Sequence, residues 1–224
     1  MDTESRKGGV LSGSPTRVWR YRATVNQGDS NKVVDIPESY LGPIINVRQG
    51  ENIRIRFKNN IPEKSIIHWY GLHVPAIMDG HPRYAVSQGQ SFLYEFTVTN
   101  RAGTYWYHPH SHGRTGPQVH GGLAGLFLVS DEEELSAGLP ENEFDVPLLI
   151  QDRTFDVDNQ FVYMSRNRMA RMTGFLKDTV LLMPGESIRI LTDFSDYSGL
   201  FLYHCHNLEH EDMGMMRNYF ARKN

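Results

Sequence analysis

The amino-acid sequence predicts an all-β fold, built as an antiparallel sandwich of short strands. Apolar and polar residues alternate in many short stretches, as in Ile53–Phe57, where apolar and basic side chains take turns. Turn-forming residues such as those of Asn59–Pro62 separate these stretches, and no long helical period is present. Part of the sequence also recurs further along the chain, which indicates a repeated β unit. Together these features favour a sandwich over a helical or mixed architecture.

The elements can be assigned in order from these patterns. Residues 1–16 are polar and rich in Gly and Ser, and we expect a flexible leader there. The acidic run Asp131–Glu134 predicts a short helix or a solvated linker. Three aromatic residues, Trp19, Tyr105 and Trp106, alternate as core positions do, and we interpret them as core. The expected strands are Val18–Val25, Ile44–Val47, Ile53–Phe57, Ile66–Gly71, Ser91–Val98, Tyr105–His108, Leu123–Val129 and Asp145–Asp152.

A chain of 224 residues can form one large β domain or two small ones. The acidic run separates two groups of strands, and we place a boundary there. We therefore expect a leader at 1–16, a complete first domain at 17–130, a linker at 131–143 and a shorter second unit at 144–224.

Composition narrows the classes of function. The net charge of -3 and the lack of a basic run argue against a nucleic-acid partner. No apolar stretch approaches the roughly 20 residues that span a bilayer. The single cysteine excludes an intrachain disulfide. The N-terminal residues lack the apolar region of a secretory signal, so we expect a cytoplasmic protein as written, or an exported one after removal of a leader.

The internal repeat joins two similar segments. Gly89–Tyr94 aligns with Gly185–Ile190, and Gly103–His110 aligns with Gly199–His206 at the same offset. Each copy contains a strand, a turn and a second strand that ends in a His-x-His motif. Two His-x-His motifs in register are much stronger evidence of a metal site than one alone.

Side chains alternate between the two faces of a strand, and this decides how each motif can work. His108 and His110 share one face, as do His204 and His206, whereas Cys205 points the opposite way. One short segment can therefore serve two metal sites, and the bonds between Cys205 and its neighbours give electrons a covalent route between them.

The residues after this motif extend the ligand set. His210 follows Cys205 at short spacing, and Met215 follows His210. A thiolate, imidazoles and a weakly bound thioether are the ligands of a blue-copper site. The alternative interpretation is a buried free cysteine with histidines on the surface.

These motifs resemble those of the multicopper oxidase family, in its group of bacterial laccases, copper-efflux oxidases and bilirubin oxidases. Members of this family are built from cupredoxin-like Greek-key β-sandwich domains. The resemblance covers most of the chain from residue 17 onward. Its motifs are His68–Leu72, Met78–Gly80, Trp106–Gly113, Gly121–Gly125 and His204–Met216.

The resemblance implies roles for particular residues. Cys205, His210 and Met215 would bind the type 1 copper, which takes electrons from the substrate. Asp79 and Glu211 match acidic residues that deliver protons to the oxygen-reducing centre. The histidines that would bind copper in that trinuclear centre are His68, His108, His110, His204 and His206.

The resemblance also implies a reaction and its partners. Such an enzyme removes electrons singly from phenols, aromatic amines or metal ions and reduces dioxygen to water. Dioxygen and a small reductant are then the partners, and we expect neither a nucleic acid nor a membrane. Two-domain relatives form trimers, which makes a homotrimer one possible assembly.

Two departures from the family pattern set this chain apart. Tyr70 stands where relatives have the second histidine of a His-x-His motif, and the usual HPxHxH motif of the last domain is absent. We therefore expect one complete cupredoxin domain followed by an incomplete second unit, and hypothesise an internal deletion near Gly174–Leu181. Two alternatives remain: a copper-binding electron-transfer protein without oxygen chemistry, and a non-catalytic structural relative.

Overall fold

The computed structural model of the chain describes residues 14–139 and most of 145–163. It also describes the backbone of three further strands, at 2–8, 199–204 and 216–221.

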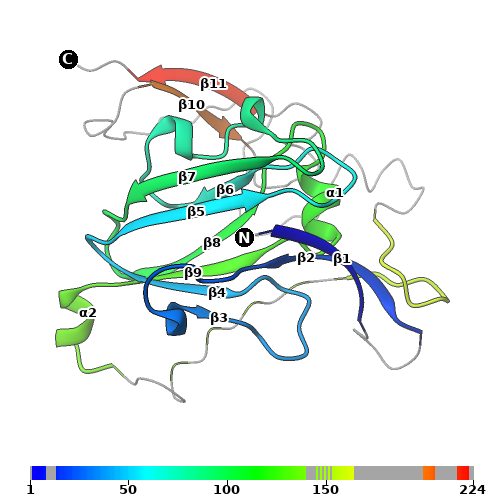
Figure 1. The fold of residues 1–224 in the computed structure, drawn as a ribbon, viewed down its shortest axis with the longest axis horizontal. Helices are drawn as coiled ribbons and strands as arrows, with labels where there is room; N and C mark the ends of the chain where they lie inside the picture. The colour runs from blue at the N-terminus through cyan, green and yellow to red at the C-terminus, as the bar shows by residue number, and fades with distance from the viewer. Residues whose placement is uncertain are drawn as a thin grey trace, which may run out of the picture.

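Two β-sheets pack face to face and form a sandwich (Figure 1). The five-stranded sheet has the order β3 (Val33–Val34), β4 (Ile44–Arg48), β9 (Gly125–Ser130), β8 (Gly103–Pro109) and β6 (Ile67–Tyr70). The four-stranded sheet has the order β2 (Thr16–Arg22), β1 (Asp2–Gly8), β5 (Asn52–Lys58) and β7 (Ser91–Thr97). A separate antiparallel pair contains β10 (Gly199–His204) and β11 (Met216–Ala221).

Among the described residues helices are few and short and the strands form two facing sheets, so the expected all-β sandwich is confirmed. No helix among the described residues is long and apolar enough to cross a membrane. The described helices are η1 (Ser30–Lys32), η2 (Ala76–Met78), η3 (Pro82–Tyr84), α1 (Thr115–His120) and α2 (Glu132–Ser136).

Each strand expected between residues 18 and 129 is present, with small shifts at the ends. The sequence predicted a flexible leader at residues 1–16, but in the structure Asp2–Gly8 forms β1, which pairs along its length with β2. Backbone hydrogen bonds make this pairing, and a polar sequence without alternation gives no sign of them. The strand expected over 145–152 is not seen at the described positions in that range, 145, 147, 149 and 151.

The space between the sheets is filled with aromatic side chains. Trp69 of β6 is fully buried and packs against Tyr94, Phe96, Tyr107 and Phe127, with ring centroids 5.1 to 5.8 Å apart. These residues come from both sheets, so a single aromatic cluster joins the two layers.

The hydroxyl of Tyr94 links the sheets by hydrogen bonds as well. It accepts a hydrogen bond from the Ile67 N–H and donates one to the Ile67 carbonyl, both at 2.8 Å. β6 is the edge strand of its sheet, and every second residue of an edge strand turns its backbone groups away from the sheet. Tyr94 therefore supplies, from the opposite sheet, the hydrogen-bond partners that the Ile67 N–H and carbonyl would otherwise find in a further strand.

A close backbone approach occurs at the same place. Gly80 has a φ of +76°, and a Cβ there would lie 2.0 Å from the Ile67 carbonyl oxygen. Only glycine fits this left-handed conformation at so short a distance. The loop after η2 is thereby pressed against the start of β6.

Asp131 organises the end of the first domain. Its carboxylate accepts hydrogen bonds from the N–H of Glu134, at 2.9 Å, and from the N–H of Ala102, at 2.6 Å. The first bond caps the N-terminus of α2, which the acidic run forms. These bonds, the Glu134 bond first, lower the pKa of Asp131 below its usual value.

Replacing Tyr94 with Phe removes the partner of two buried backbone groups without changing the ring. We expect Tyr94→Phe to lower the free energy of unfolding by about 1–3 kcal/mol, measured by urea denaturation. Tyr105→Phe is the control, because the Tyr105 hydroxyl donates to the Arg101 carbonyl at 3.0 Å in an exposed position. It should cost no more than about 0.5 kcal/mol. Equal losses in the two variants would contradict this assignment.

The lowered pKa of Asp131 predicts a pH dependence. Because the folded state favours the ionised carboxylate, this stabilisation is present above the unfolded pKa, near 3.8, and is lost as pH falls through the lower folded value. Asp131→Asn should therefore reduce the urea midpoint at pH 7, and the difference from wild type should shrink at about pH 3. Glu133→Gln changes the same charge at an exposed position and serves as control. A difference that stays constant with pH would refute the prediction.

Candidate metal centre

Three histidine side chains come together at the β6–β8 edge of the five-stranded sheet. His68 and His108 are direct partners in the antiparallel pairing, and the His110 N–H donates to the Ile66 carbonyl at 2.9 Å. The ring centroids are 5.3 Å apart for His68–His108, 5.1 Å for His68–His110 and 6.0 Å for His108–His110. His108 and His110 are fully buried. The structure thus brings together every first-domain histidine that the sequence singled out.

Backbone carbonyl groups fix the orientation of two of these rings. The Nδ1 atom of His68 lies 2.6 Å from the Asp79 carbonyl oxygen, and Nδ1 of His108 lies 2.8 Å from the Pro109 carbonyl oxygen. A carbonyl oxygen can only accept, so Nδ1 carries the proton and donates in both residues. Nε2 is then the atom with a lone pair, which is the usual arrangement of a metal-binding histidine.

Asp79 also approaches the cluster with its side chain. Its Oδ1 atom lies 3.2 Å from Nδ1 of His68. Gly80 holds this part of the loop against β6, and the Sδ atom of Met78 accepts a hydrogen bond from the Glu95 N–H at 3.4 Å. The loop therefore places one carbonyl group and one carboxylate beside the same imidazole.

A polar network anchors the chain on both sides of the histidines. Gln118 donates to the Lys64 carbonyl at 2.8 Å and accepts from the Ser65 hydroxyl at 3.0 Å. The guanidinium group of Arg114 forms an ion pair with Glu63 and donates a hydrogen bond to each of the two Glu63 carboxylate oxygens. These contacts connect the segment just before β6 with the segment just after His110, so the spacing of the histidines is set from two directions.

Two aromatic residues continue the histidine face of the sheet. The Trp106 ring lies 4.3 Å from the His108 ring, and Tyr70 lies 5.7 Å from Trp106 and 6.4 Å from His68. The sequence-based interpretation of Trp106 as core is wrong, because it stands on the face opposite the buried Tyr107. Its spacing of two from His108 was the signal that could have revealed this.

No three His, Cys, Asp or Glu side chains among the described residues are grouped closely enough to hold one metal ion. Cys205, His206, His210, Glu211 and Met215, all proposed from the sequence, lie outside the described residues.

For His204, the backbone alone is described, as the last residue of β10. β10 lies against η2, the turn that leads directly into Asp79. The strand that ends at His204 is therefore next to the loop that orients His68.

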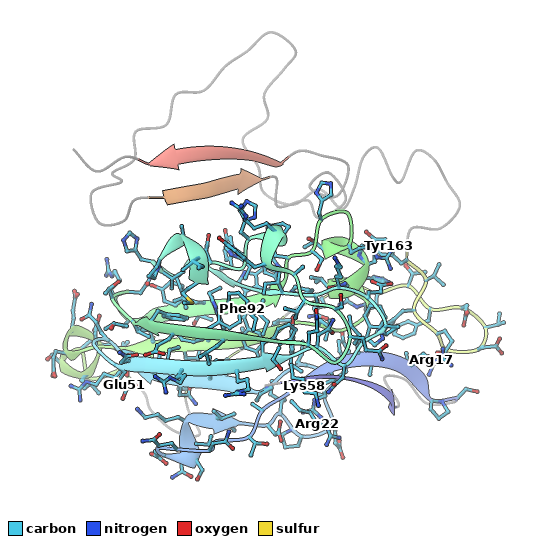
Figure 2. All side chains as sticks on the ribbon, turned by 45° about the horizontal axis from the view of Figure 1, so that its top comes forward. Arg17, Arg22, Glu51, Lys58, Phe92 and Tyr163 are labelled. Atoms are coloured by element: carbon cyan, nitrogen blue, oxygen red, sulfur yellow. The ribbon has the colours of Figure 1, made fainter. Side chains whose placement is uncertain are left out.

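A groove of about 1130 Å³ lies elsewhere, where β2 meets α1 and residues 158–163. Its wall includes Trp19, His120, Phe161 and Tyr163, and the His120 ring lies 5.1 Å from the Tyr163 ring. Figure 2 shows Tyr163 beside α1. None of the three cluster histidines lines this groove, so it is separate from the candidate metal centre.

Comparisons with known proteins agree with the architecture. The laccase of Bacillus stratosphericus is 31% identical over 180 residues, which is 68% of this chain and 32% of the laccase. The cell division protein FtsP of Sodalis glossinidius is 33% identical over 187 residues, 82% of this chain and 38% of FtsP. The crystal structure of the McoA multicopper oxidase from Aquifex aeolicus superposes with a TM-score of 0.64 at 40% identity, and covers 80% of this chain and 37% of McoA.

The chain spans between 26% and 38% of the length of the curated relatives that it matches. Two sequence profiles described as multicopper oxidase match it, one over residues 17–134 and the other over residues 153–224. The first covers the domain that holds the histidine cluster, and the second covers the His-Cys-His segment. The chain therefore belongs to the multicopper oxidase family, whose cofactor is copper.

Proposed function

We propose that this protein is a laccase-like copper oxidoreductase. It would remove electrons singly from phenols, aromatic amines or metal ions and pass them to dioxygen, which is reduced to water. The observation that carries the proposal is the cluster of His68, His108 and His110, in which two Nδ1 atoms donate to backbone carbonyls and the last two residues are fully buried. Membership of the family and the similarity to a named laccase support it.

The described residues fit copper on chemical grounds. Imidazole nitrogen is a ligand that copper accepts readily, and because Nδ1 of His68 and of His108 donates to a carbonyl, Nε2 is the atom of each ring that could coordinate a metal. Copper, when bound, supplies the one-electron redox chemistry that side chains alone do not provide. The protein's own contribution is to hold the imidazoles, to exclude water through burial and to place a carboxylate beside His68.

The remaining ligands belong to the second unit in this proposal. In it, the copper that accepts electrons from the substrate is bound by Cys205, His210 and Met215. His204 and His206 bind copper together with the first-domain histidines. The contact of β10 with η2 supports this arrangement, because η2 leads directly into Asp79. Asp79 and Glu211 deliver the protons that water formation consumes.

We retain the proposed division into a first domain at 17–130, a linker at 131–143 and an incomplete second unit at 144–224. The two family matches, which end and restart close to that linker, support it. The histidines that the family pattern requires beyond those present would come from another chain. A homo-oligomer, for example a trimer, is the assembly that we propose.

Copper content and the visible spectrum test this proposal together. We expect copper-loaded protein to show the intense blue absorption of a Cu(II)–thiolate site and to consume oxygen with a phenolic reductant. Cys205→Ser should abolish the blue band and leave part of the copper bound. His112→Gln, at an exposed histidine outside the cluster, is the control and should keep both the blue band and the oxygen uptake. Absence of the band after loading would reject the oxidase, and a band without oxygen uptake would identify an electron-transfer protein instead.

The role of Asp79 can be separated from that of its backbone. Asp79→Asn keeps the carbonyl that orients His68 but removes the acidic group. We expect unchanged copper content with oxygen uptake reduced by about 10²–10⁴-fold, the usual contribution of general acid–base catalysis. Asp145→Asn, at an exposed position, should leave both unchanged. Loss of copper from Asp79→Asn would show that the side chain holds the site rather than moves protons.

A further inference from the structure

We infer that Trp106 and Tyr70 form a path of side chains that carries oxidising equivalents from the histidine cluster to the surface of the protein. Tyr70 is then the residue that becomes oxidised when peroxide meets the copper-loaded protein in the absence of a reducing substrate. This inference rests on the copper binding proposed above.

The pairing of β6 with β8 places four rings on one face. His68 is opposite His108, and Tyr70 is opposite Trp106, so the four rings are neighbours on this face. Trp106 lies over His108 with ring centroids 4.3 Å apart and an interplanar angle of 31°, the shortest spacing in this group. Tyr70 contacts Trp106 at 5.7 Å and His68 at 6.4 Å. Two of the proposed copper ligands therefore have a ring-to-ring connection to Tyr70.

Exposure distinguishes Tyr70 from the other aromatic residues nearby. Tyr70 is 39% exposed, whereas Trp69 and Tyr107, on the opposite face of the same two strands, are fully buried. A tyrosine that loses an electron must also release its phenolic proton. Tyr70 can release that proton to water, and burial denies this to Tyr107. The exit of the path is therefore at Tyr70.

The reaction balances with peroxide as the oxidant. Two Tyr70 phenols, on two chains, each lose one electron and one proton. The electrons pass through Trp106 to the cluster, and one peroxide molecule takes up two electrons and two protons and becomes two molecules of water. The two phenoxyl radicals then form a carbon–carbon bond, which joins the chains as a dityrosine. Oxidising equivalents leave the cluster in this way without attacking the ligand histidines.

The test uses the full chain, loaded with copper and treated with hydrogen peroxide without a reductant. We expect a covalent dimer on a denaturing gel, dityrosine fluorescence, and a cross-linked peptide that contains Tyr70. Tyr70→Phe should reduce the dimer at least tenfold, and Trp106→Phe should slow its formation several-fold. Tyr105→Phe, on the other face of β8, is the matched control and should behave as wild type. All variants are compared at equal copper content and equal thermal midpoint.

Three results would overturn the path. Tyr70→Phe could cross-link as fast as wild type, mapping could place the bond at other tyrosines, or copper-free protein could cross-link equally well. If copper binds and supports oxygen uptake but Tyr70 stays unmodified, the inference about the path is wrong and the proposed function stands. If the chain binds no copper, the proposed function and the path fail together.

Discussion

The hydroxyl of Tyr94, held between the N–H and the carbonyl of Ile67, is the contact on which the candidate site depends. It joins the two sheets at the residue directly before His68. Gly80 also lies close to this carbonyl, and the same loop brings Asp79 to the His68 ring. One edge of the sandwich therefore joins the two sheets, orients the His68 ring and sets the tautomer of this candidate ligand.

Much of this could be predicted from the sequence, and the reasons are physical. Period-two alternation revealed the strands and placed His108 and His110 on one face, because that pattern depends only on local geometry. The partnership of Asp79 with Nδ1 of His68 was not predictable, since it joins residues brought together by a loop. The same holds for Tyr94, whose apolar ring fits the core pattern while its hydroxyl serves a distant backbone. β1 was missed because a polar strand held by backbone bonds leaves no pattern in its side chains.

The two parts of the chain contribute differently to the proposed chemistry. The first domain holds a compact cluster of imidazoles whose spacing is fixed by Gln118 and the ion pair of Arg114 with Glu63. The only cysteine stands in the second unit. Electron entry and oxygen reduction would therefore be divided between the units, and β10 contacts η2, the turn that precedes Asp79.

The choice of carbonyl groups as partners for His68 and His108 has an electrostatic consequence. Both acceptors are neutral, and the imidazoles that bind a metal are neutral as well. Cations held in this cluster would keep nearly all of their positive charge, with the Asp79 carboxylate as the nearby exception. Charge neutrality must then be reached from solution. Hydroxide and other small anions that can enter the site are the species that this arrangement favours.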